Sequence, residues 1–330
     1  MPPSYLKAHQ EGSLREKAES LYSRLGSCDI CPRLCKADRL NNRLGFCKTG
    51  RKAKVYSYFA HHGEEPAISG TKGSGTIFFT NCNLRCVYCQ NYEFSQSDKG
   101  REAEEEELAS FMLELQQEGC HNINFVTPTH NIPQILKALC FAVEKGLKIP
   151  LVYNSSGYDS AETLRFLEGI FDIYLPDARY ADSQTALKLS QAKDYWSINQ
   201  AALKEMHRQV GIAQLNPDEI IGKGLIIRHL VLPNNLSGTG EIMAFIAREL
   251  GPDTYISLMS QYFPCHKAND YPELSRRLTL EEYQEAMDIM HSHGLHNGWV
   301  QDEQGLDRFA GVNIKANLQI PFDSKDRLDK

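Results

Sequence analysis

Three cysteines lie close together in the stretch TNCNLRCVYCQN, residues 80–91: Cys82, Cys86 and Cys89. A structural zinc site takes four protein ligands, and a cubane iron–sulfur cluster is normally held by four cysteines. This loop has no fourth Cys or His at the spacing of a zinc knuckle. Three cysteines at these spacings can wrap a four-iron cube and leave one iron without a protein ligand. Because a substrate or cofactor needs such an open position, we predict a [4Fe–4S] cluster with one open iron.

Four further cysteines precede this loop in the sequence. They follow the pattern C-x2-C-x3-C-x11-C in CDICPRLCKADRLNNRLGFC, where a proline and a glycine suit turns: Cys28, Cys31, Cys35 and Cys47. Four cysteines can fully ligate either a zinc ion or an auxiliary iron–sulfur cluster, and the spacing does not choose between them. We expect a metal in this segment. Two roles stay open for this metal. It could be purely structural, which we favour, or it could relay electrons into the cluster of the three-cysteine loop.

Composition limits the class of protein. The chain has 330 residues, 42% of them hydrophobic, which is enough for one large domain plus a small one or for two ordinary domains. The formal net charge is −6 and no run of basic residues stands out, so we expect neither nucleic acid nor a membrane as a partner. No apolar stretch has the length of a signal peptide core or of a transmembrane helix. We therefore expect a cytoplasmic protein.

The expected compartment decides how the cysteines are interpreted. Cytosolic cysteines stay largely reduced, so clustered ones indicate metal or redox chemistry rather than disulfides. Cys120 and Cys140 stand alone in helix-like segments and are expected to be small core hydrophobes. Cys265, in QYFPCH, follows a predicted strand and is left without a predicted role.

Short apolar runs alternate with helical patterns along the chain. The runs are rich in branched and aromatic residues and end in polar or turn residues, which is typical of strands. Strands that are almost continuously apolar suit a parallel sheet buried on both faces. The six runs are TIFFT at 76–80, NINFVT at 122–127, PLVYN at 150–154, FDIYLP at 171–176, LIIRHLVLP at 225–233 and TYISLM at 254–259, and GWVQ at 298–301 is a candidate seventh.

The helices between these strands carry recognisable start and stop signals. Asn131 is placed to cap a helix that has Pro133 in its first turn and ends near Gly146. Thr279 and Glu282 form a capping-box pattern for a helix over 280–293. Four consecutive glutamates at 104–107 would sit favourably at the positive N-terminal end of another helix.

Six strand–helix units in a row predict an α/β fold, a partial (β/α)6 TIM-like barrel, preceded by the small cysteine-rich metal-binding segment. We expect an N-terminal helix with the four-cysteine segment over 1–72, the barrel over 73–305 and a C-terminal tail over 306–330. Reactive groups in such folds gather at the carboxyl ends of the strands. The three-cysteine loop begins directly after GTIFFT, so it lies where chemistry is expected.

The pattern Cys82-x3-Cys86-x2-Cys89, with Tyr88 before the third cysteine, resembles the signature of the radical S-adenosylmethionine (radical SAM) superfamily. The segment GEEPAISGTKGSGTIFFTNCNLRCVYCQN resembles the pyruvate formate-lyase activating enzyme-related proteins, the PflX-like branch. The four-cysteine segment and the stretches VTPTHNIPQI, YLPDARY, RHLVLP and SLMSQYFP fit the same branch. The resemblance covers roughly residues 20 to 305.

This resemblance implies a mechanism. The open iron would chelate the amino and carboxylate groups of SAM, and the reduced cluster would pass one electron into the sulfonium. Cleavage of the carbon–sulfur bond would give methionine and a 5′-deoxyadenosyl radical, which abstracts a hydrogen atom from the substrate. The protein would supply position, cluster potential and exclusion of water. The name of the branch adds the expectation that the substrate is a glycyl radical enzyme.

The resemblance also implies contacts to SAM at the strand ends. Members of the family commonly have a Gly-Gly-Glu-like stretch after the second strand, but this chain has VTPTH there, with no such glycines. The residues that we expect to bind SAM are Tyr88, Thr127, Thr129, His130, Asn154, Ser155, Asp177 and Arg228. For Thr129 the alternative is helix capping, and for Arg228 it is a structural ion pair rather than a bidentate contact to the SAM carboxylate.

Two classes of function therefore remain. In the first, the chain is a radical SAM enzyme, an oxidoreductase of anaerobic chemistry, that takes electrons from a flavodoxin or ferredoxin-like donor. Its substrate would be a glycyl radical enzyme, a peptide or a small molecule. In the second, the chain is a non-catalytic iron–sulfur electron carrier with two clusters. The length of the chain argues against a carrier, and turnover of SAM would distinguish the two classes.

Overall fold

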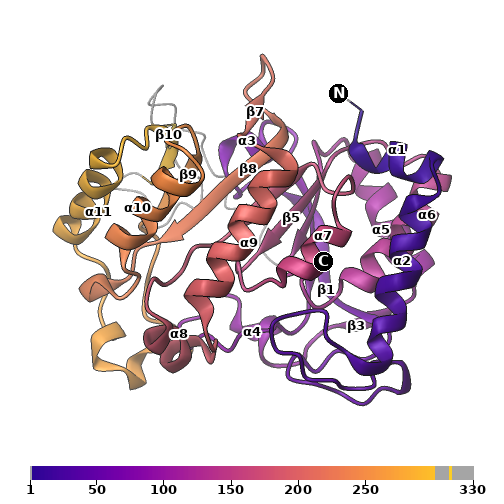
Figure 1. Ribbon diagram of the computed structural model, residues 1–330, viewed down its shortest axis with the longest axis horizontal. Coiled ribbons are helices and arrows are strands. Elements are labelled where there is room, and N and C mark those ends of the chain that lie inside the picture. The colour runs from indigo at the N-terminus through magenta and orange to yellow at the C-terminus, as the bar shows by residue number, and fades with distance from the viewer. Residues whose placement is uncertain (1, 302–311, 314–330) are drawn as a thin grey trace.

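A computed structural model describes residues 2–301 and 312–313 of the chain. Its strands form one curved sheet in the order β11-β10-β9-β8-β6-β5-β4-β2-β1-β3, with β7 paired to β8 (Figure 1). The strands are β1 (Ala53–His61), β2 (Ser74–Phe79), β3 (Arg101–Ala103), β4 (Ile123–Val126), β5 (Leu151–Ser155), β6 (Ile173–Pro176), β7 (Gln214–Leu215), β8 (Ile221–Leu230), β9 (Tyr255–Met259), β10 (Asn297–Val300) and β11 (Val312–Asn313).

The middle of the sheet is parallel from β2 to β10. All six predicted strands are present within a few residues of their predicted ends, and the candidate strand at 298–301 is confirmed as β10. Every residue of β4, β5 and β6 is buried, as expected for parallel strands covered on both faces. The predicted partial (β/α) barrel is therefore confirmed.

The antiparallel strands are the part of the sheet that sequence analysis missed. β1 pairs with β2, β3 pairs with β1, and β7 and β11 pair with β8 and β10. β1 is mostly half-buried, because it lies near the edge of the sheet. A half-buried strand mixes polar and apolar residues, so KVYSYFAH lacks the continuous apolar run by which the inner strands were recognised.

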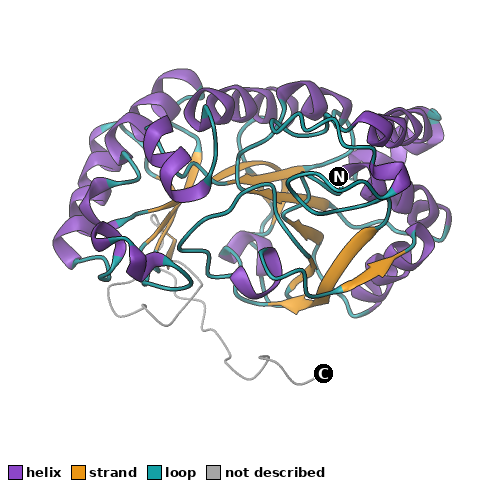
Figure 2. Ribbon diagram, turned by 90° about the horizontal axis from the view of Figure 1, so that it is seen from below, coloured by secondary structure: helices purple, strands orange, loops and turns teal. Residues whose placement is uncertain are grey.

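Helices cover the outer, convex side of the curved sheet, as Figure 2 shows. The helices of the described residues are α1 (Ser4–Gln10), α2 (Ser13–Ser23), α3 (Pro66–Ser69), α4 (Tyr92–Ser95), α5 (Glu105–Gln117), α6 (Ile132–Glu144), α7 (Ala161–Phe166), α8 (Ser183–Ser190), α9 (Tyr195–Val210), α10 (Thr239–Glu249) and α11 (Leu280–Ser292). The short helices α3 and α4 are not part of the outer layer: α3 lies between β1 and β2, and α4 follows the three-cysteine loop. The N-terminal helix α2 packs on α6 and so adds a further layer outside the barrel helices (Figure 1).

The predicted helix ends are largely confirmed. α11 begins with the capping box of Thr279 and Glu282, and three of the four glutamates at 104–107 form the first turn of α5. Asn131 is at the N-cap of α6, but the prediction that its side chain caps the helix is wrong, because no such bond forms. The amide instead contacts the ring of His130 at 3.1 Å.

The segment between β1 and β2 closes the floor of the barrel. Because β1 runs antiparallel to β2, the chain leaves β1 beside the amino end of β2, with His61 opposite Ser74. It then forms the short helix α3, whose Ile68 is fully buried against residues at the starts of the inner strands, including Val152 and Ile173. Asn122 donates to the Ile68 carbonyl at 2.8 Å. The floor is thus made by a segment that precedes the first parallel strand.

The division predicted at residue 72 stays a prediction. β1 lies before that boundary, and it is hydrogen-bonded to β2, which lies after it. The predicted tail over 306–330 falls outside the described residues apart from the two residues of β11. Among the described residues, none of the helices combines the length and apolarity needed to cross a bilayer.

The floor should contribute measurably to stability. Ile68→Ala removes a fully buried side chain and leaves a cavity, so we expect the free energy of unfolding to fall by about 2–5 kcal/mol. Ile212→Ala is the matched control, because Ile212 is 40% exposed and should change the value by less than about 0.5 kcal/mol. Denaturant unfolding of the two variants measures this, and equal losses would show that α3 does not close the floor.

Candidate functional site

The three-cysteine loop leaves the carboxyl end of β2 and leads into α4. Its shape is held by its own side chains. Arg85 donates to the Cys82 carbonyl at 2.7 Å, and Asn83 donates to the Tyr158 carbonyl at 2.8 Å. Cys86 is buried, whereas Cys82 and Cys89 are half-buried. The predicted position of the loop, at the end of the first parallel strand, is the observed one.

Hydrogen-bond donors point at the sulfur atoms of this loop. Arg179 donates from Nη1 to Cys86 Sγ at 3.1 Å, and Ser190 Oγ donates to the same sulfur at 3.0 Å. The Leu84 amide donates to Cys82 Sγ at 3.3 Å. Donors of this kind stabilise negative charge on sulfur and tune the potential of an iron–sulfur cluster. The surroundings therefore suit thiolates that ligate a metal.

Burial has the opposite effect on the free thiols. Burial, together with the neighbouring Cys86 thiol, raises the pKa of Cys82 to about 12 and also raises the pKa of Cys89. A metal would remove these protons on binding, since only the thiolate ligates. Within the described residues, no three His, Cys, Asp or Glu side chains converge as one metal ion requires. In an iron–sulfur cluster each cysteine binds a separate iron, so the cysteines do not converge on one ion.

A small pocket of about 140 Å³ opens beside this loop at the carboxyl ends of β6, β8 and β9. Most of its lining is polar or charged: Tyr88, Cys89, Gln90, Asn91, Asp177, Arg179, Arg228, Leu230, Met259 and Gln261. Several strand ends and the cysteine loop contribute to it, which is the arrangement expected of an active site in this class of fold.

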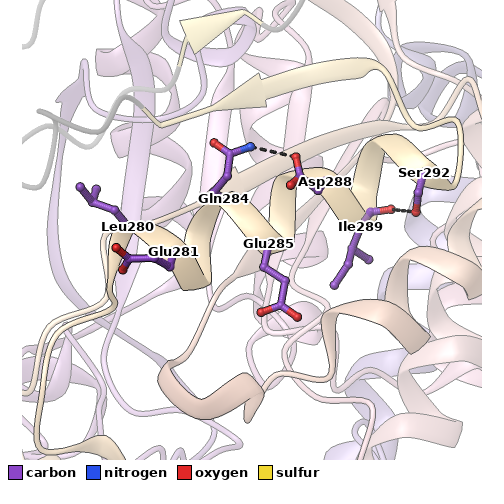
Figure 3. Close-up of a pocket in the computed structure, with 7 residues that line it drawn as sticks. All are labelled: Leu280, Glu281, Gln284, Glu285, Asp288, Ile289 and Ser292. Atoms are coloured by element: carbon purple, nitrogen blue, oxygen red, sulfur yellow. Dashed lines mark hydrogen bonds between the residues drawn. The ribbon is translucent and has the colours of Figure 1, made fainter.

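A larger hollow, of about 670 Å³, lies elsewhere and has none of these features. All seven of its lining residues belong to α11, so it is an open surface beside one helix, as Figure 3 shows. Its visible hydrogen bonds are local to that helix, such as the 2.8 Å bond from Gln284 to Asp288. We therefore take the smaller pocket as the candidate site.

Asp177 is the centre of an ionic network in the candidate site. It forms a parallel bridge with Arg228, which brings both side chains to the same face of the sheet. One carboxylate oxygen accepts from Arg228 Nε at 2.9 Å, and the other accepts from Arg179 Nε at 2.9 Å. Burial acts to raise the pKa of Asp177, but the two guanidinium groups outweigh it and hold the pKa below its ordinary value. Asp177 is therefore ionised at neutral pH.

Two buried glutamates from the barrel floor extend this network, and sequence analysis assigned them no role. Glu64 lies 3.5 Å from Arg228 and accepts hydrogen bonds from Asn124 and Asn154. Burial raises the pKa of both Glu64 and Glu65, although Arg228 opposes the shift. The sequence GEEP looks like an exposed acidic turn, and only the antiparallel path of β1 brings these side chains into the barrel.

The predicted SAM contacts fall into two groups in the structure. Tyr88, Asp177 and Arg228 line the pocket, and Asn154 accepts a 2.7 Å hydrogen bond from Arg228. These four side chains therefore lie at the pocket, where a bound ligand would be. Their role in binding SAM stays a prediction.

The remaining predicted contacts are engaged elsewhere. Thr129 and Ser155 both donate to the buried carboxylate of Asp159, at 2.7 and 2.6 Å. His130 is buried and contacts the Thr80 carbonyl at 3.2 Å. Burial, and then the charge of Arg39, lower the pKa of His130 to about 3, so its ring is neutral.

Thr127 has a left-handed backbone, with a φ of 60°, and its amide donates to the Asn154 carbonyl at 2.9 Å. The capping alternative for Thr129 is not observed in its bonds, since its hydroxyl contacts Asp159. The ion-pair alternative for Arg228 is observed, and it is compatible with a ligand contact because a guanidinium has five donors.

The segment after β9 packs over the cysteine loop. Gln90 donates to the Gln261 carbonyl at 2.9 Å, and the Lys267 amide donates to the Val87 carbonyl at 2.8 Å. Cys265, which had no predicted role, donates from Sγ to the Tyr88 carbonyl at 3.3 Å. QYFPCH therefore belongs to the wall of the site, a contact between distant segments that no local pattern indicates.

The four-cysteine segment forms a compact loop at the same end of the barrel, below α2 and β3 in Figure 1. Cys28, Cys31 and Cys47 are buried and Cys35 is exposed. Burial raises the pKa of Cys31, and the other three thiols are close enough to raise it further. A Cβ atom on Gly45 would lie 2.5 Å from Cys35 Sγ, so only glycine leaves room for that thiol. The thiols of Cys28, Cys35 and Cys47 are therefore near enough to that of Cys31 to affect its pKa.

Asp177 should be essential to the stability of the site. Asp177→Ala leaves two guanidinium groups in the network without their shared carboxylate, so we expect a loss of about 3–5 kcal/mol in the free energy of unfolding at neutral pH. Asp288→Ala, on the exposed face of α11, is the control and should change little.

The same ion pairs set a pH dependence. Since the pKa of Asp177 is lowered in the folded state, its contribution is present above the ordinary aspartate pKa and is lost as the pH falls through the lowered value. Denaturant unfolding at several pH values measures this. If the wild type and Asp177→Ala lost stability in parallel on acidification, Asp177 would not be the group responsible.

Comparison with known proteins gives three findings. The model of the Radical SAM superfamily matches residues 76–209. The uncharacterized protein MJ0674 of Methanocaldococcus jannaschii is 34% identical over 280 residues, which cover 82% of this chain and 75% of that protein. The uncharacterized protein MJ0808 of the same organism is 23% identical over 282 residues, covering 77% and 78%.

Two solved structures are similar at lower identity. The FeFe-hydrogenase maturase HydG from Carboxydothermus hydrogenoformans has a TM-score of 0.48 and 11% identity, covering 71% of this chain and 55% of that chain. A structure of TYW1 with a lysine-pyruvate adduct bound has a TM-score of 0.45 and 10% identity, covering 71% and 78%.

Proposed function

Because the chain belongs to the radical SAM superfamily, we propose that it cleaves SAM reductively and uses the 5′-deoxyadenosyl radical to abstract a hydrogen atom from a substrate. The observation that supports this proposal most is the three-cysteine loop at the carboxyl end of β2, with donors aimed at its sulfur atoms. When bound, a [4Fe–4S] cluster and SAM supply the electron and the radical. The side chains of the chain must then hold both groups and exclude water.

In this proposal Cys82, Cys86 and Cys89 hold the cluster. Arg179 and Ser190 donate to Cys86 Sγ, and hydrogen bonds to a ligand sulfur stabilise the more reduced, more negative state of a cluster. Both donors are fixed by further bonds. Arg179 is bonded to Asp177, and Ser190 lies 2.7 Å from the Tyr180 hydroxyl. In this proposal Arg179 and Ser190 therefore stabilise the negative charge that the cluster gains when it is reduced.

The charged groups of the pocket suit the amino-acid part of SAM. Arg228 keeps donors beyond those that it gives to Asp177 and Asn154, and it can present them to a carboxylate. Asp177 is ionised and can attract an ammonium group. Thr129 and Ser155, which donate to Asp159, would act indirectly by positioning the strand ends.

The substrate is a finer question, which the resemblance to the PflX-like branch addresses. Within our proposal the hydrogen donor is a glycine of a glycyl radical enzyme or, as the alternative, a peptide or small molecule. The electron donor is a flavodoxin or ferredoxin-like protein. A second cluster or a zinc ion on the four N-terminal cysteines is also part of this proposal, and it is supported by the effect of the other three thiols on the pKa of Cys31.

Cys86→Ala tests the proposal directly. We expect SAM cleavage to be abolished, because one cluster ligand is lost, while the fold is retained. Cys140→Ala is the matched control, since Cys140 is half-buried in α6 and should leave cleavage unchanged. The measurement is 5′-deoxyadenosine formed anaerobically from SAM and dithionite by the reconstituted protein, with iron per chain and circular dichroism recorded for each variant.

The result separates the two classes of function. Deoxyadenosine from the wild type and Cys140→Ala, but not from Cys86→Ala, supports a radical SAM enzyme. Cleavage retained in Cys86→Ala would refute the assignment of that ligand. A fully loaded, reducible wild type that forms no deoxyadenosine, with and without candidate substrates, would indicate an electron carrier instead.

A further inference from the structure

Three arginines near the cysteines are sheltered from water and lack a carboxylate partner. The other buried or half-buried arginines of the described residues each pair with a carboxylate, namely Arg24, Arg51, Arg179 and Arg228. The three exceptions have no carboxylate oxygen of a described residue within 4.0 Å: Arg33, Arg39 and Arg85. Burying a positive charge without a negative partner costs free energy. These three guanidinium groups therefore need a negative charge other than a carboxylate.

Arg39 is the clearest of the three cases. Its side chain is fully buried, although it belongs to the four-cysteine segment near the surface. Its Nη1 donates to Cys28 Sγ at 3.6 Å, and its Nε donates to the Gly50 carbonyl at 3.3 Å. Its Nη2 is buried and has no hydrogen-bond partner among the described residues. The side chain to which Arg39 donates is thus a cysteine of the segment.

Arg33 lies near the thiols of both sets of cysteines. Its Nη2 is also buried without a hydrogen-bond partner in the described part of the chain. Burial is the main influence on the pKa of Arg33 and lowers it, whereas the thiols of Cys31 and Cys82 act in the opposite direction. Arg85 differs, because it donates to three backbone carbonyls and a structural role accounts for it. Arg33 and Arg39 therefore remain as the two cations without a counter-charge.

Thiolates on a metal would supply this counter-charge. A thiol is neutral, whereas a cysteine that ligates a metal is a thiolate. A zinc ion or an oxidised [4Fe–4S] cluster held by four thiolates has a net charge of about −2. Such a centre in the four-cysteine segment would turn Arg39 from an unpaired buried charge into a paired one. The two arginines thus match the charge of the centre.

We propose that Arg39 and Arg33 are the counter-charges of an anionic metal centre that is ligated by all four thiolates of Cys28, Cys31, Cys35 and Cys47. The inference deepens the proposed function, in which these cysteines hold zinc or a cluster. Binding breaks four S–H bonds, forms four bonds from sulfur to metal and releases four protons to the solvent, without oxidation or reduction of the sulfur. Arg39 is then a positioning residue that stabilises the metal-bound segment and destabilises the metal-free one.

Zinc and an oxidised cluster present the same charge to Arg39, so the inference concerns the charge of the centre. The described thiols do not converge on one point. Ligation would draw them together around zinc or place each of them on its own iron. Zinc, iron and sulfide per chain in the purified protein distinguish the two centres.

Arg39→Met tests the charge, because methionine is a flexible apolar side chain that fills the space without a charge. The parent is the full chain with Cys86→Ala, so that the three-cysteine loop lacks a ligand. The probe is Zn²⁺, and its Kd is measured against a competing chelator. We expect the Kd to rise about tenfold or more. Without metal, we expect Arg39→Met to unfold at the same or a higher denaturant concentration than the parent, because an unpaired buried charge has been removed.

Arg24→Met is the matched control, since Arg24 is half-buried in the same N-terminal region but pairs with Asp29 at 2.7 Å. It should lower the unfolding midpoint equally with and without Zn²⁺ and leave the Kd unchanged. Arg39→Lys keeps the positive charge and should restore most of the affinity. An unchanged Kd in Arg39→Met would overturn the inference. So would a clear loss of stability in the metal-free Arg39→Met protein, which indicates a purely structural arginine.

Gly45→Ala tests whether the exposed Cys35 is the fourth ligand, and it changes no charge. The added Cβ would lie 2.5 Å from Cys35 Sγ. A free thiol at the surface can rotate away, but a thiol bound to metal cannot. We therefore expect a Kd for Zn²⁺ that is about tenfold higher or more, with unchanged stability of the metal-free protein. Gly26→Ala is the control, since its Cβ would meet only an ordinary contact of 3.6 Å. Equal Kd values in both variants would remove Cys35 from the ligands and overturn a centre of four thiolates.

The metal content of the wild type separates this inference from the cleavage of SAM. About one zinc per chain beside about four irons, or about eight irons without zinc, supports the centre. About four irons and no zinc would overturn it, because only the three-cysteine loop would then be loaded. Deoxyadenosine formed from SAM and dithionite by the same sample tests the proposed function independently, so each of the two can fail while the other holds.

Discussion

The carboxylate of Asp177, held between two guanidinium groups, is the interaction on which the site depends. Arg179 connects it to Cys86 Sγ, and Arg228 connects it to Asn154 and to Glu64 from the barrel floor. Burying a charged group without a partner of opposite charge costs free energy. Each charged residue of this network therefore depends on its neighbour in the network. The strand ends, the cysteine loop and the floor are therefore held in one geometry by charge as well as by packing.

The four-cysteine segment is also held in place by a few contacts of charged side chains. Arg33 and Arg85 both lie over its Phe46 ring, and these arginines donate to carbonyls across the boundary between segment and loop. A guanidinium stacks on an aromatic ring while its N–H groups still bond in the plane, so few residues join the two loops firmly.

Sequence patterns were most informative where local physics decides. The inner strands are buried on both faces, so their apolar runs were visible and their number was nearly right. The capping box of α11 depends on residues three positions apart and was predicted correctly. Asn131 was assigned as a capping side chain, but its amide contacts the ring of the preceding residue, His130, instead. Contacts to Asp159 likewise draw Thr129 and Ser155 together, which no spacing indicates.

The amino-acid sequence by itself determined the repeated strand–helix pattern, the two sets of cysteines and the place of the three-cysteine loop after β2. These features arise from periodicity and spacing, which are local properties of the chain. Only the tertiary structure decided that Glu64 enters the barrel, that Arg179 reaches Cys86, and that the four-cysteine segment packs on the three-cysteine loop. Each of these depends on long-range pairing, above all the antiparallel β1, because burial and charge are properties of the assembled fold.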